Sequence, residues 1–534
     1  MRSKYLLGIL LFVIYTTFSQ ENNSVLFTID DEPYYTKEFL NVYKKNLKLV
    51  VESKSDVVDY LDLFVDYKLK VKQAKELGLD TLQKFKNELR QYKNNLVLPY
   101  LRDEAVTKQL IKEAYERLKE EVNVSHILLF LKPDASPQDT IVAYNKLIEA
   151  RNLVLSGSRF SDIAKKYSKD PSVEQNGGSV GYFTALQMVY SFENVAFNTK
   201  LNEVSQPFRT KFGYHILKVN GRRDSKGEVE VAHIMFKNNG QNSKKKIDSI
   251  YQLLLKQEIS FSNLAKKVSE DRTSAIKGGK LKKFGTGKMI ENFTSVAFSL
   301  LEKGDISAPF KTQFGWHVIK LLKKYPLKSF DEMEGKIRQE VEKDARANLI
   351  GKSVLDKLLK HYNVLVNKQA LDQFNKGNWK NNPKKFNKIL FSINQKEISQ
   401  KKFITYLNSV SHTPVKEAFI TFKEKTVLDY YKDNIEHSNP EFAVKYSEFK
   451  EGLLLFDLLE KYVWEKAKDR VGLLKYFNIN KEKIYRGKEF DSIKGNLISD
   501  YQNYLDIQFA KQLHKKYVVK INKSEKKRIK KLNF

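Results

Sequence analysis

The sequence predicts an α+β multidomain protein, in which two tandem α+β domains are flanked by mainly helical modules at both ends. Three observations support this prediction. The chain has 534 residues, which is too many for one hydrophobic core. A segment of about 100 residues occurs twice in its middle. A second, fainter repeat of helical segments lies on either side of that pair.

The first residues are typical of a secretory signal peptide. A basic stretch, MRSK, precedes the apolar run YLLGILLFVIYTTF, and the polar residues SQENN end that run. The run is shorter than the ~20 apolar residues that span a bilayer, so we predict a cleaved signal over 1–20 and not a membrane anchor. The chain has no cysteine, which excludes disulfides, thiolate metal sites and thiol catalysis. These features predict a secreted protein.

The next module, over 21–123, forms half of the fainter outer repeat. Its counterpart is the module predicted over 389–534, and a helical connector is expected over 326–388. Both halves begin with a hairpin-like segment and continue as long amphipathic helices. The matched pairs are VLFTIDDEPYYTKEFLNVY (25–43) with ILFSINQKEISQKKFITYL (389–407), and FKNELRQYKNNLVLPYLRDEAV (85–106) with FAVKYSEFKEGLLLFDLLEKYV (442–463).

The inner repeat predicts two small α+β domains, over 124–222 and 228–325, joined by the polar linker NGRRDSKGE. Each copy reads as strand, helix, short helix, glycine turn with strand, helix and final strand. The four blocks that recur in order are VSHILLF (124–130) with VAHIMF (231–236), RFSDIAKKYSKDPSVEQNGGSVGYF (159–183) with SFSNLAKKVSEDRTSAIKGGKLKKF (260–284), MVYSFENVAF (188–197) with MIENFTSVAF (289–298), and KFGYHILK (211–218) with QFGWHVIK (313–320).

The chain carries a formal net charge of +31. Basic and acidic residues alternate over most of its length, which is typical of a solvated surface. The tail from Lys515 differs, because it has nine Lys or Arg and a single Glu in twenty residues. Such a tail could also attract an anionic membrane surface or a nucleic acid.

The blocks of the inner repeat resemble parvulin-type peptidyl-prolyl cis–trans isomerases. That family has S-H-I-L in its first strand, then F-x-x-L/I-A-x-x-x-S-x-D, G-G-x-L-G, a Met and a Phe four residues apart, and a final F-G-Y/W-H-I/V-I. All of these blocks stand here twice, over about 200 of the 534 residues. Helical segments around two such domains, behind a signal, resemble the SurA class of periplasmic folding factors. The resemblance therefore implies a periplasmic location.

The resemblance also implies one site in each copy. In the family, two histidines and an acid form a hydrogen-bonded floor under the peptide bond, and apolar side chains form a cup around the proline ring. The implied catalytic residues are His126, Asp170 and His215 in the first copy and His233, Asp271 and His317 in the second. The implied substrate-binding residues are Val180, Met188, Phe192 and Phe212 in the first copy and Leu281, Met289, Phe293 and Phe314 in the second.

Three positions depart from the family pattern. Val180 stands where leucine is usual, and Leu186 stands where glycine is common. Lys282 occupies the place that Gly181 has in the first copy, where a lysine would change the rim of the pocket. The sequence does not decide which copy is active.

These residues predict an isomerase and chaperone that binds unfolded, proline-containing chains, with outer-membrane or secreted proteins as clients. No cofactor, metal or nucleic acid is expected, and an anionic membrane surface is a further candidate partner. Two alternatives stay open. The parvulin folds can serve as non-catalytic peptide-binding modules of a chaperone, or the basic tail can make the protein a binder of anionic surfaces. The histidines and the two FxxVAF helices are also compatible with a purely structural role.

Overall fold

The computed structural model describes residues 24–47, 56–133, 135–238, 240–376, 379–410 and 413–532. The signal predicted over 1–20 lies outside these residues. Contacts divide the chain into two compact units: residues 1–99 with 429–534 form unit 1, and residues 100–428 form unit 2. The boundaries of these units differ from those of the predicted modules. The module boundaries stay a prediction. The mixture of sheets and helices confirms the predicted α+β multidomain class.

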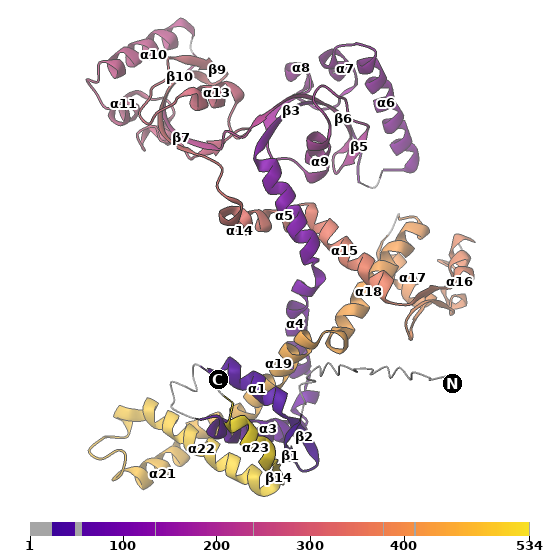
Figure 1. Cartoon of the computed structure of the whole chain (residues 1–534), viewed down its shortest axis with the longest axis vertical. Helices are drawn as coiled ribbons and strands as arrows, with labels where there is room; N and C mark the ends of the chain where they lie inside the picture. Colours follow the sequence, from indigo (N-terminus) through magenta and orange to yellow (C-terminus); the bar gives the residue numbers. More distant parts are fainter. Residues whose placement is uncertain are drawn as a thin grey trace, which may run out of the picture. The chain divides into compact units, whose positions relative to one another are not determined.

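In unit 2, the first inner repeat folds as a four-stranded antiparallel sheet with strand order β4-β3-β6-β5 (Figure 1). The helices α6 and α7 cover one face through Ile127 and Leu129, and α9 covers the other through Val122 and Val124. This alternation is the period of two that a strand imposes on its side chains. The elements are β3 (Glu120–Phe130), α6 (Pro137–Leu155), α7 (Phe160–Tyr167), α8 (Val173–Asn176), β4 (Ser179–Phe183), α9 (Tyr190–Asn198), β5 (Phe208–Thr210) and β6 (Gly213–Asp224).

The second inner repeat has the same architecture, with strand order β8-β7-β10-β9. In the first repeat His126 pairs with Leu217, and in the second His233 pairs with Ile319. The two copies therefore share their register as well as their order. The elements are β7 (Glu228–Lys237), α10 (Gly240–Leu255), α11 (Phe261–Val268), α12 (Arg272–Ala275), β8 (Phe284–Gly285), α13 (Glu291–Ser299), β9 (Phe310–Thr312) and β10 (Gly315–Tyr325).

The polar linker expected between the repeats is mostly strand. β6 runs on to Asp224 and β7 begins at Glu228, which leaves three residues between them. β3 correspondingly begins at Glu120, before the predicted domain start. Ion pairs across the strands, Arg222 with Glu120 and Arg223 with Glu121, each measure 2.7 Å. Opposite charges facing each other stabilise strand pairing, so charged residues here extend the sheet.

The rest of unit 2 consists of helices and a small three-stranded sheet. α5, α14 and α15 share a buried apolar cluster of Leu110, Ile111, Ala114, Ile337, Val341 and Ile350. The elements are α5 (Glu104–Leu118), α14 (Phe330–Val341), α15 (Arg346–His361), β11 (Val364–Val366), α16 (Lys368–Asp372), β12 (Ile389–Ile393), β13 (Lys396–Ser399), α17 (Gln400–Ser409) and α18 (Val415–Ser438), the last of which runs across the unit boundary.

Unit 1 joins the two ends of the described chain through a three-stranded sheet of order β14-β1-β2. Within the described ranges, none of the helices is both long and apolar enough to cross a membrane. The elements are β1 (Val25–Ile29), β2 (Glu32–Tyr35), α1 (Thr36–Lys45), α3 (Val57–Glu76), α4 (Gln83–Leu96), α19 (Pro440–Leu459), α20 (Glu465–Lys468), α21 (Arg470–Asn480), α22 (Lys494–Lys516), β14 (Val519–Ile521) and α23 (Lys523–Lys530).

The small sheets of the two units are built alike. In unit 1, β1 and β2 form a hairpin and β14 pairs with β1, so that Ile521 faces Phe27. In unit 2, β12 and β13 form the hairpin and β11 pairs with β12, so that Val366 faces Phe391. The segments that start the outer repeat therefore form the same three-stranded module twice. In unit 1, the third strand of that module comes from the end of the described chain.

The second pair of outer segments differs in structure. α4 ends at Leu96, whereas α19 continues to Leu459. Tyr92 and Phe449, which align in sequence, stack on each other with ring centroids 3.4 Å apart. These two helices are therefore packing partners within unit 1.

Candidate active site

The paired histidines of each repeat come from neighbouring strands. His126 lies on β3 opposite Leu217, and His215 lies two residues before Leu217 on β6. Residues two apart on a strand share a face, so both imidazoles lie on the face covered by α9. Their ring centroids are 5.7 Å apart and the ring planes differ by 20°. The rings of His233 and His317 repeat this arrangement at 5.8 Å and 20°.

Hydrogen bonds connect the first pair into a chain. His126 Nε2 lies 3.0 Å from Asp170 Oδ2, and His126 Nδ1 lies 3.5 Å from His215 Nδ1. His215 Nε2 lies 2.8 Å from Thr210 Oγ1. The same hydroxyl oxygen accepts the backbone N–H of Phe212 at 3.1 Å. The chain therefore runs from threonine through both imidazoles to the carboxylate.

This network assigns the tautomers of both imidazoles. Because the ionised carboxylate of Asp170 only accepts, a neutral His126 donates from Nε2 and accepts at Nδ1. The hydroxyl of Thr210 donates its proton to His215 Nε2. His215 then carries its proton on Nδ1 and donates it to His126 Nδ1. His126 in turn carries its proton on Nε2 and donates it to Asp170. Both imidazoles are neutral in this arrangement.

The pKa values agree with neutral imidazoles. Burial, reinforced by the neighbouring His126, lowers the pKa of His215 to about 3. Burial also lowers the pKa of His126, although Asp170 opposes the shift. For Asp170, burial would raise the pKa, but hydrogen bonds from Ser172 and the nearby His126 outweigh it and the net shift is downward. The floor therefore consists of two neutral rings above one carboxylate.

The second repeat places the same residue types in its floor, with one added hydroxyl and without the bond between the imidazoles. His233 Nε2 lies 2.7 Å from Asp271 Oδ2 and 2.9 Å from Ser274 Oγ. His317 Nε2 lies 2.8 Å from Thr312 Oγ1. Burial, followed by the neighbouring His233, lowers the pKa of His317 to about 4. The Nδ1 atoms of both imidazoles are buried and have no hydrogen-bond partner among the described residues.

Aromatic side chains form a wall over each floor. Phe192 on α9 meets His126 and His215 edge to face, with centroid distances of 5.7 Å to each. Phe293 on α13 meets His233 and His317 in the same way, at 5.9 Å and 5.5 Å.

The remaining predicted cup residues lie beside these walls. Val180 and Met188 pack in the apolar cluster that contains Phe192. Leu281 packs in the cluster that contains Phe293, whereas Met289 is 37% exposed and is not part of that cluster. The structure therefore brings eleven of the fourteen predicted site residues together, six in the first repeat and five in the second, where Met289 stays exposed.

Two of the other three, Phe212 and Phe314, lie on exposed turns. They are 48% and 59% exposed. In their place, Phe208 and Phe310 stack on His215 and His317, each with a centroid distance of 5.4 Å. The reason is strand register, because Phe208 pairs directly with His215 across the sheet, and Phe310 pairs with His317.

Sequence reasoning missed these phenylalanines and the two threonines of the hydrogen-bond chain. A signal for them existed in the repeat itself. PFRTKFGYH contains Phe208 and Thr210, and PFKTQFGWH contains Phe310 and Thr312 at the same spacing. The phenylalanine and the threonine of each segment are two residues apart on a strand, so their side chains share a face.

The arrangement provides an apolar wall above a hydrogen-bonded floor of two neutral imidazoles and one carboxylate. Within the described ranges, no group of three or more His, Asp or Glu side chains could hold a metal ion. Such a site can bind and orient an apolar ring next to a planar polar group.

Comparison with known families agrees with this geometry. Models of the PPIC-type peptidyl-prolyl isomerase (PPIase) domain match residues 108–223 and residues 233–323. The chain carries two PPIC-type PPIase domains in tandem. The first match begins within α5, so the first PPIC-type domain includes part of that helix.

Several relatives share these domains. The chaperone SurA of Nitrosococcus oceani is 31% identical over 208 residues, which cover 38% of this chain and 48% of that protein. The foldase protein PrsA of Caldanaerobacter subterraneus is 31% identical over 211 residues, or 36% and 65% of the two chains. A crystal structure of PrsA from Bacillus anthracis is 34% identical, covers 26% of this chain and 60% of that one, and has a TM-score of 0.19. This chain thus spans about half of the SurA relative and less than two thirds of the other two.

Proposed function

We propose that this protein is a peptidyl-prolyl cis–trans isomerase and folding chaperone that binds extended, proline-containing chains and isomerises their X–Pro bonds. One observation supports the enzymatic part most directly. Each PPIC-type domain places two neutral imidazoles and a carboxylate under an aromatic wall. The similarity to SurA and PrsA proteins supports the chaperone part.

The reaction requires no bond to be made or broken. Amide resonance sets a barrier of roughly 18–20 kcal/mol to rotation, and isomerisation of X–Pro bonds takes tens to hundreds of seconds without a catalyst. A catalyst must therefore bind the twisted amide more tightly than either planar form. Each ~1.4 kcal/mol of such preference accelerates the reaction tenfold.

The proposed roles follow from the polarity of each part. A twisted amide has lost its charge separation, so it favours a site whose walls are apolar and whose imidazoles are neutral. Phe192 and Phe293 hold the proline ring, with the rest of the cup around them. The cup residues are Val180, Met188 and Phe208 in the first domain and Leu281, Met289 and Phe310 in the second. The floor residues are His126, Asp170 and His215 in the first domain and His233, Asp271 and His317 in the second.

Isomerisation of a proline peptide by the full chain tests this function. We expect Asp170→Ala with Asp271→Ala, and likewise Met188→Ala with Met289→Ala, to lower kcat/KM at least tenfold, because losing ~1.4 kcal/mol of preference for the twisted amide already costs a factor of ten. Asp248→Ala, an exposed position on α10, is the matched control and should not change the rate. If parent and variants all stay at the uncatalysed rate, the enzymatic proposal is wrong. Aggregation suppression without isomerisation would instead support the non-catalytic chaperone.

A hollow in unit 1 supports the chaperone role. Its volume is about 340 Å³, and its lining combines Leu63, Leu455 and Leu459 with charged side chains such as Asp66, Lys70 and Asp506. The neighbouring Leu454 and Leu458 are fully buried. One face of α19 therefore belongs to the hydrophobic core, and the adjacent face lines the hollow. An extended client segment can lie in this hollow. We propose outer-membrane or secreted proteins as the clients, and the periplasm as the location.

Contact with an anionic membrane surface is a further proposal for the tail. Ile529 of α23 is buried in the apolar cluster of unit 1, while Lys523, Lys527 and Lys530 on the same helix are exposed. Retention on vesicles with anionic lipid should fall for Lys527→Glu with Lys530→Glu, and should weaken as salt is added. Unchanged retention would exclude the tail as the contact.

A further inference from the structure

The two PPIC-type domains differ at three positions around the cup helix. Leu186, Tyr190 and Glu193 stand in the first domain where the second has Gly287, Glu291 and Thr294. These positions flank Met188 and Phe192, which belong to the proposed cup. Glu193 follows Phe192 on α9, so contacts that hold Glu193 in place also position the aromatic wall formed by Phe192.

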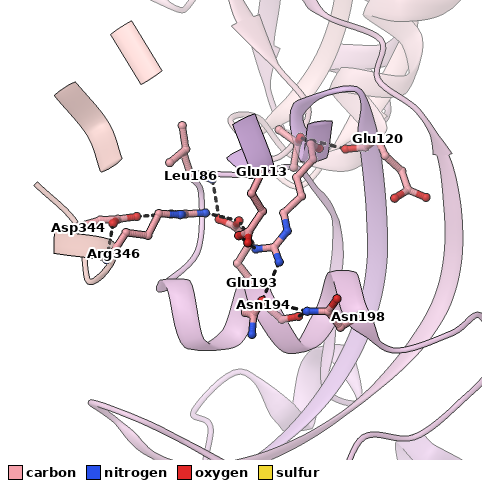
Figure 2. A network of polar contacts seen from close by, with 10 residues as sticks. Glu113, Glu120, Leu186, Glu193, Asn194, Asn198, Asp344 and Arg346 are labelled. Carbon is pink, nitrogen blue, oxygen red and sulfur yellow. Dashed lines mark hydrogen bonds and ion pairs between the residues drawn. The ribbon is translucent and has the colours of Figure 1, made fainter. Parts of the chain in front are cut away.

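Glu193 is completely buried between two arginines that come from helices outside the sheet (Figure 2). Its Oε1 lies 2.5 Å from Arg346 Nη2 of α15 and 3.1 Å from Arg117 Nη1 of α5. Its Oε2 accepts the backbone N–H of Leu186 at 2.8 Å. Asp344 pairs with the other side of Arg346, as Figure 2 shows. Every oxygen of this buried carboxylate therefore has a partner.

Apolar contacts reinforce the ionic ones. Leu186 and Tyr190 pack against the cluster shared by α5, α14 and α15. The Tyr190 ring also lies 4.2 Å from the guanidinium carbon of Arg346. Leu186 reaches the cluster from a left-handed backbone with φ +65°, which favours glycine. The equivalent Gly287 has φ +79°, so the first domain keeps the turn and adds a side chain that docks.

The second domain holds its cup helix differently. No arginine pairs with α13 among the described residues, and the turn before it meets the first domain instead, where Gln187 Nε2 donates to the carbonyl oxygen of Thr286 at 2.9 Å. The hydroxyl of Thr294 donates to the carbonyl oxygen of Met289, within the same domain, at 3.3 Å. Glu291 makes no ion pair with any residue that the structure describes. The difference is thus specific to α9 and does not come from the common fold.

We propose that Glu193 is a positioning residue: through Arg346 and Arg117 it ties α9 to α5 and α15, so that proline binding in the first site depends on helices outside its sheet. The second site is independent of them. Buried charges must be paired with good geometry, and charge-assisted hydrogen bonds from two arginines to one carboxylate are stronger than neutral ones. The inference rests on the proposed isomerase function and concerns its first site.

The test uses Arg346→Met in the full chain, because Arg346 lies outside both family-matched domains. One background silences the second site with Asp271→Ala and Met289→Ala, and the other silences the first with Asp170→Ala and Met188→Ala. We expect kcat/KM of the first site to fall about tenfold, mainly through a higher KM, and that of the second site to stay within twofold. Arg338→Met is the control, since Arg338 of α14 pairs with Glu104 and not with α9.

Amide hydrogen exchange provides a readout that does not need catalysis. In Arg346→Met, exchange in α9 should accelerate about tenfold, while exchange in α13 stays unchanged. If both sites lose activity equally, the role of Arg346 is general stability and the proposal is wrong; it is also wrong if α9 exchange or the first-site KM is unaffected. Should Arg346→Met unfold unit 2, the neutral pair Glu193→Gln with Arg346→Met replaces it.

The same measurements separate this inference from the proposed function. If the first site of the parent does not isomerise proline peptides, the isomerase function fails for that domain. The proposed link from Glu193 to α5 and α15 is then tested by amide exchange in α9. The affinity for a proline peptide, measured from the NMR shifts of His126 and His215, provides a second test. Unchanged exchange and affinity in Arg346→Met would contradict this link.

Discussion

Hydrogen bonds fix the side chains under each proposed cup, and burial keeps their imidazoles neutral. Thr210 and Thr312 sit at the end of the chain, and each gives the inner histidine a partner for Nε2. The outer histidine then faces the carboxylate with the nitrogen that carries its proton. Burial and hydrogen bonding therefore select the same protonation state. Two predictions follow at this scale.

Thr210→Val keeps the shape of the side chain and removes the hydroxyl. Because Nε2 of the buried His215 then lacks a partner, we expect unit 2 to lose about 1–3 kcal/mol of unfolding free energy. Urea denaturation measures this loss, and first-site activity should fall with it. Thr421→Val, at an exposed position on α18, is the control. Equal stability of both variants would contradict the proposed chain.

The pH dependence of stability follows from the lowered histidine pKa. An unfolded imidazole titrates near ~6.5, whereas the pKa of His215 is about 3 and that of His317 about 4. Between these values the unfolded state binds more protons, so this stability is fully present above ~6.5 and is lost as the pH falls. Each imidazole contributes about 1.4 kcal/mol per pH unit in that window.

Urea denaturation at pH 7, 6 and 5 measures this slope. The variant His215→Asn should show a shallower slope than the parent, whatever its absolute stability. A slope that does not change in this variant would show that His215 is not the titrating group.

At the level of elements, the same three-stranded module occurs in both units with different chain connections. In unit 2 the third strand, β11, directly precedes the hairpin that it joins. In unit 1 the third strand, β14, comes from the end of the described chain and pairs with β1. Asn522 and Asn367 cap the helix after each third strand in the same way. The last helix of unit 1 is therefore part of its fold.

Ile529→Ala tests this conclusion. Ile529 on α23 is fully buried in the cluster formed by β1, α1 and α3. Removing its side chain should cost about 2–5 kcal/mol of unfolding free energy. Ile479→Ala, at a position that is 69% exposed, should stay within about 0.5 kcal/mol. Similar midpoints in thermal unfolding would show that α23 does not stabilise unit 1.

At the scale of the whole molecule, the two proposed activities lie in different units. The proposed isomerase sites belong to unit 2, and the hollow proposed for clients belongs to unit 1. Each unit has its own buried clusters. Client binding and isomerisation should therefore be separable by mutation.

Leu63→Ser with Leu455→Ser tests this separation. Losing apolar contact in the hollow should weaken client binding about tenfold or more, since ~1.4 kcal/mol already changes affinity tenfold. Suppression of aggregation of an unfolded protein measures the effect, while the isomerisation rate should not change. Leu474→Ser, exposed on α21 and outside the hollow, is the control. Equal suppression by parent and variant would exclude this hollow as the client site.

The sequence by itself determined the two repeats, their class and their family. These features are local: strand and helix periods, glycine turns and the order of blocks all lie within about 100 residues. The two PPIC-type domains were predicted this way and are confirmed by the family models. The residue roles within the sites stay a prediction.

Only the tertiary structure decided which distant residues meet. Phe208 replaced Phe212 beside His215 because strand register, and not proximity in sequence, selects the neighbour across a sheet. The contact between Glu193 and Arg346 joins residues 153 positions apart. Such contacts depend on how whole elements pack, which no local pattern of residues encodes.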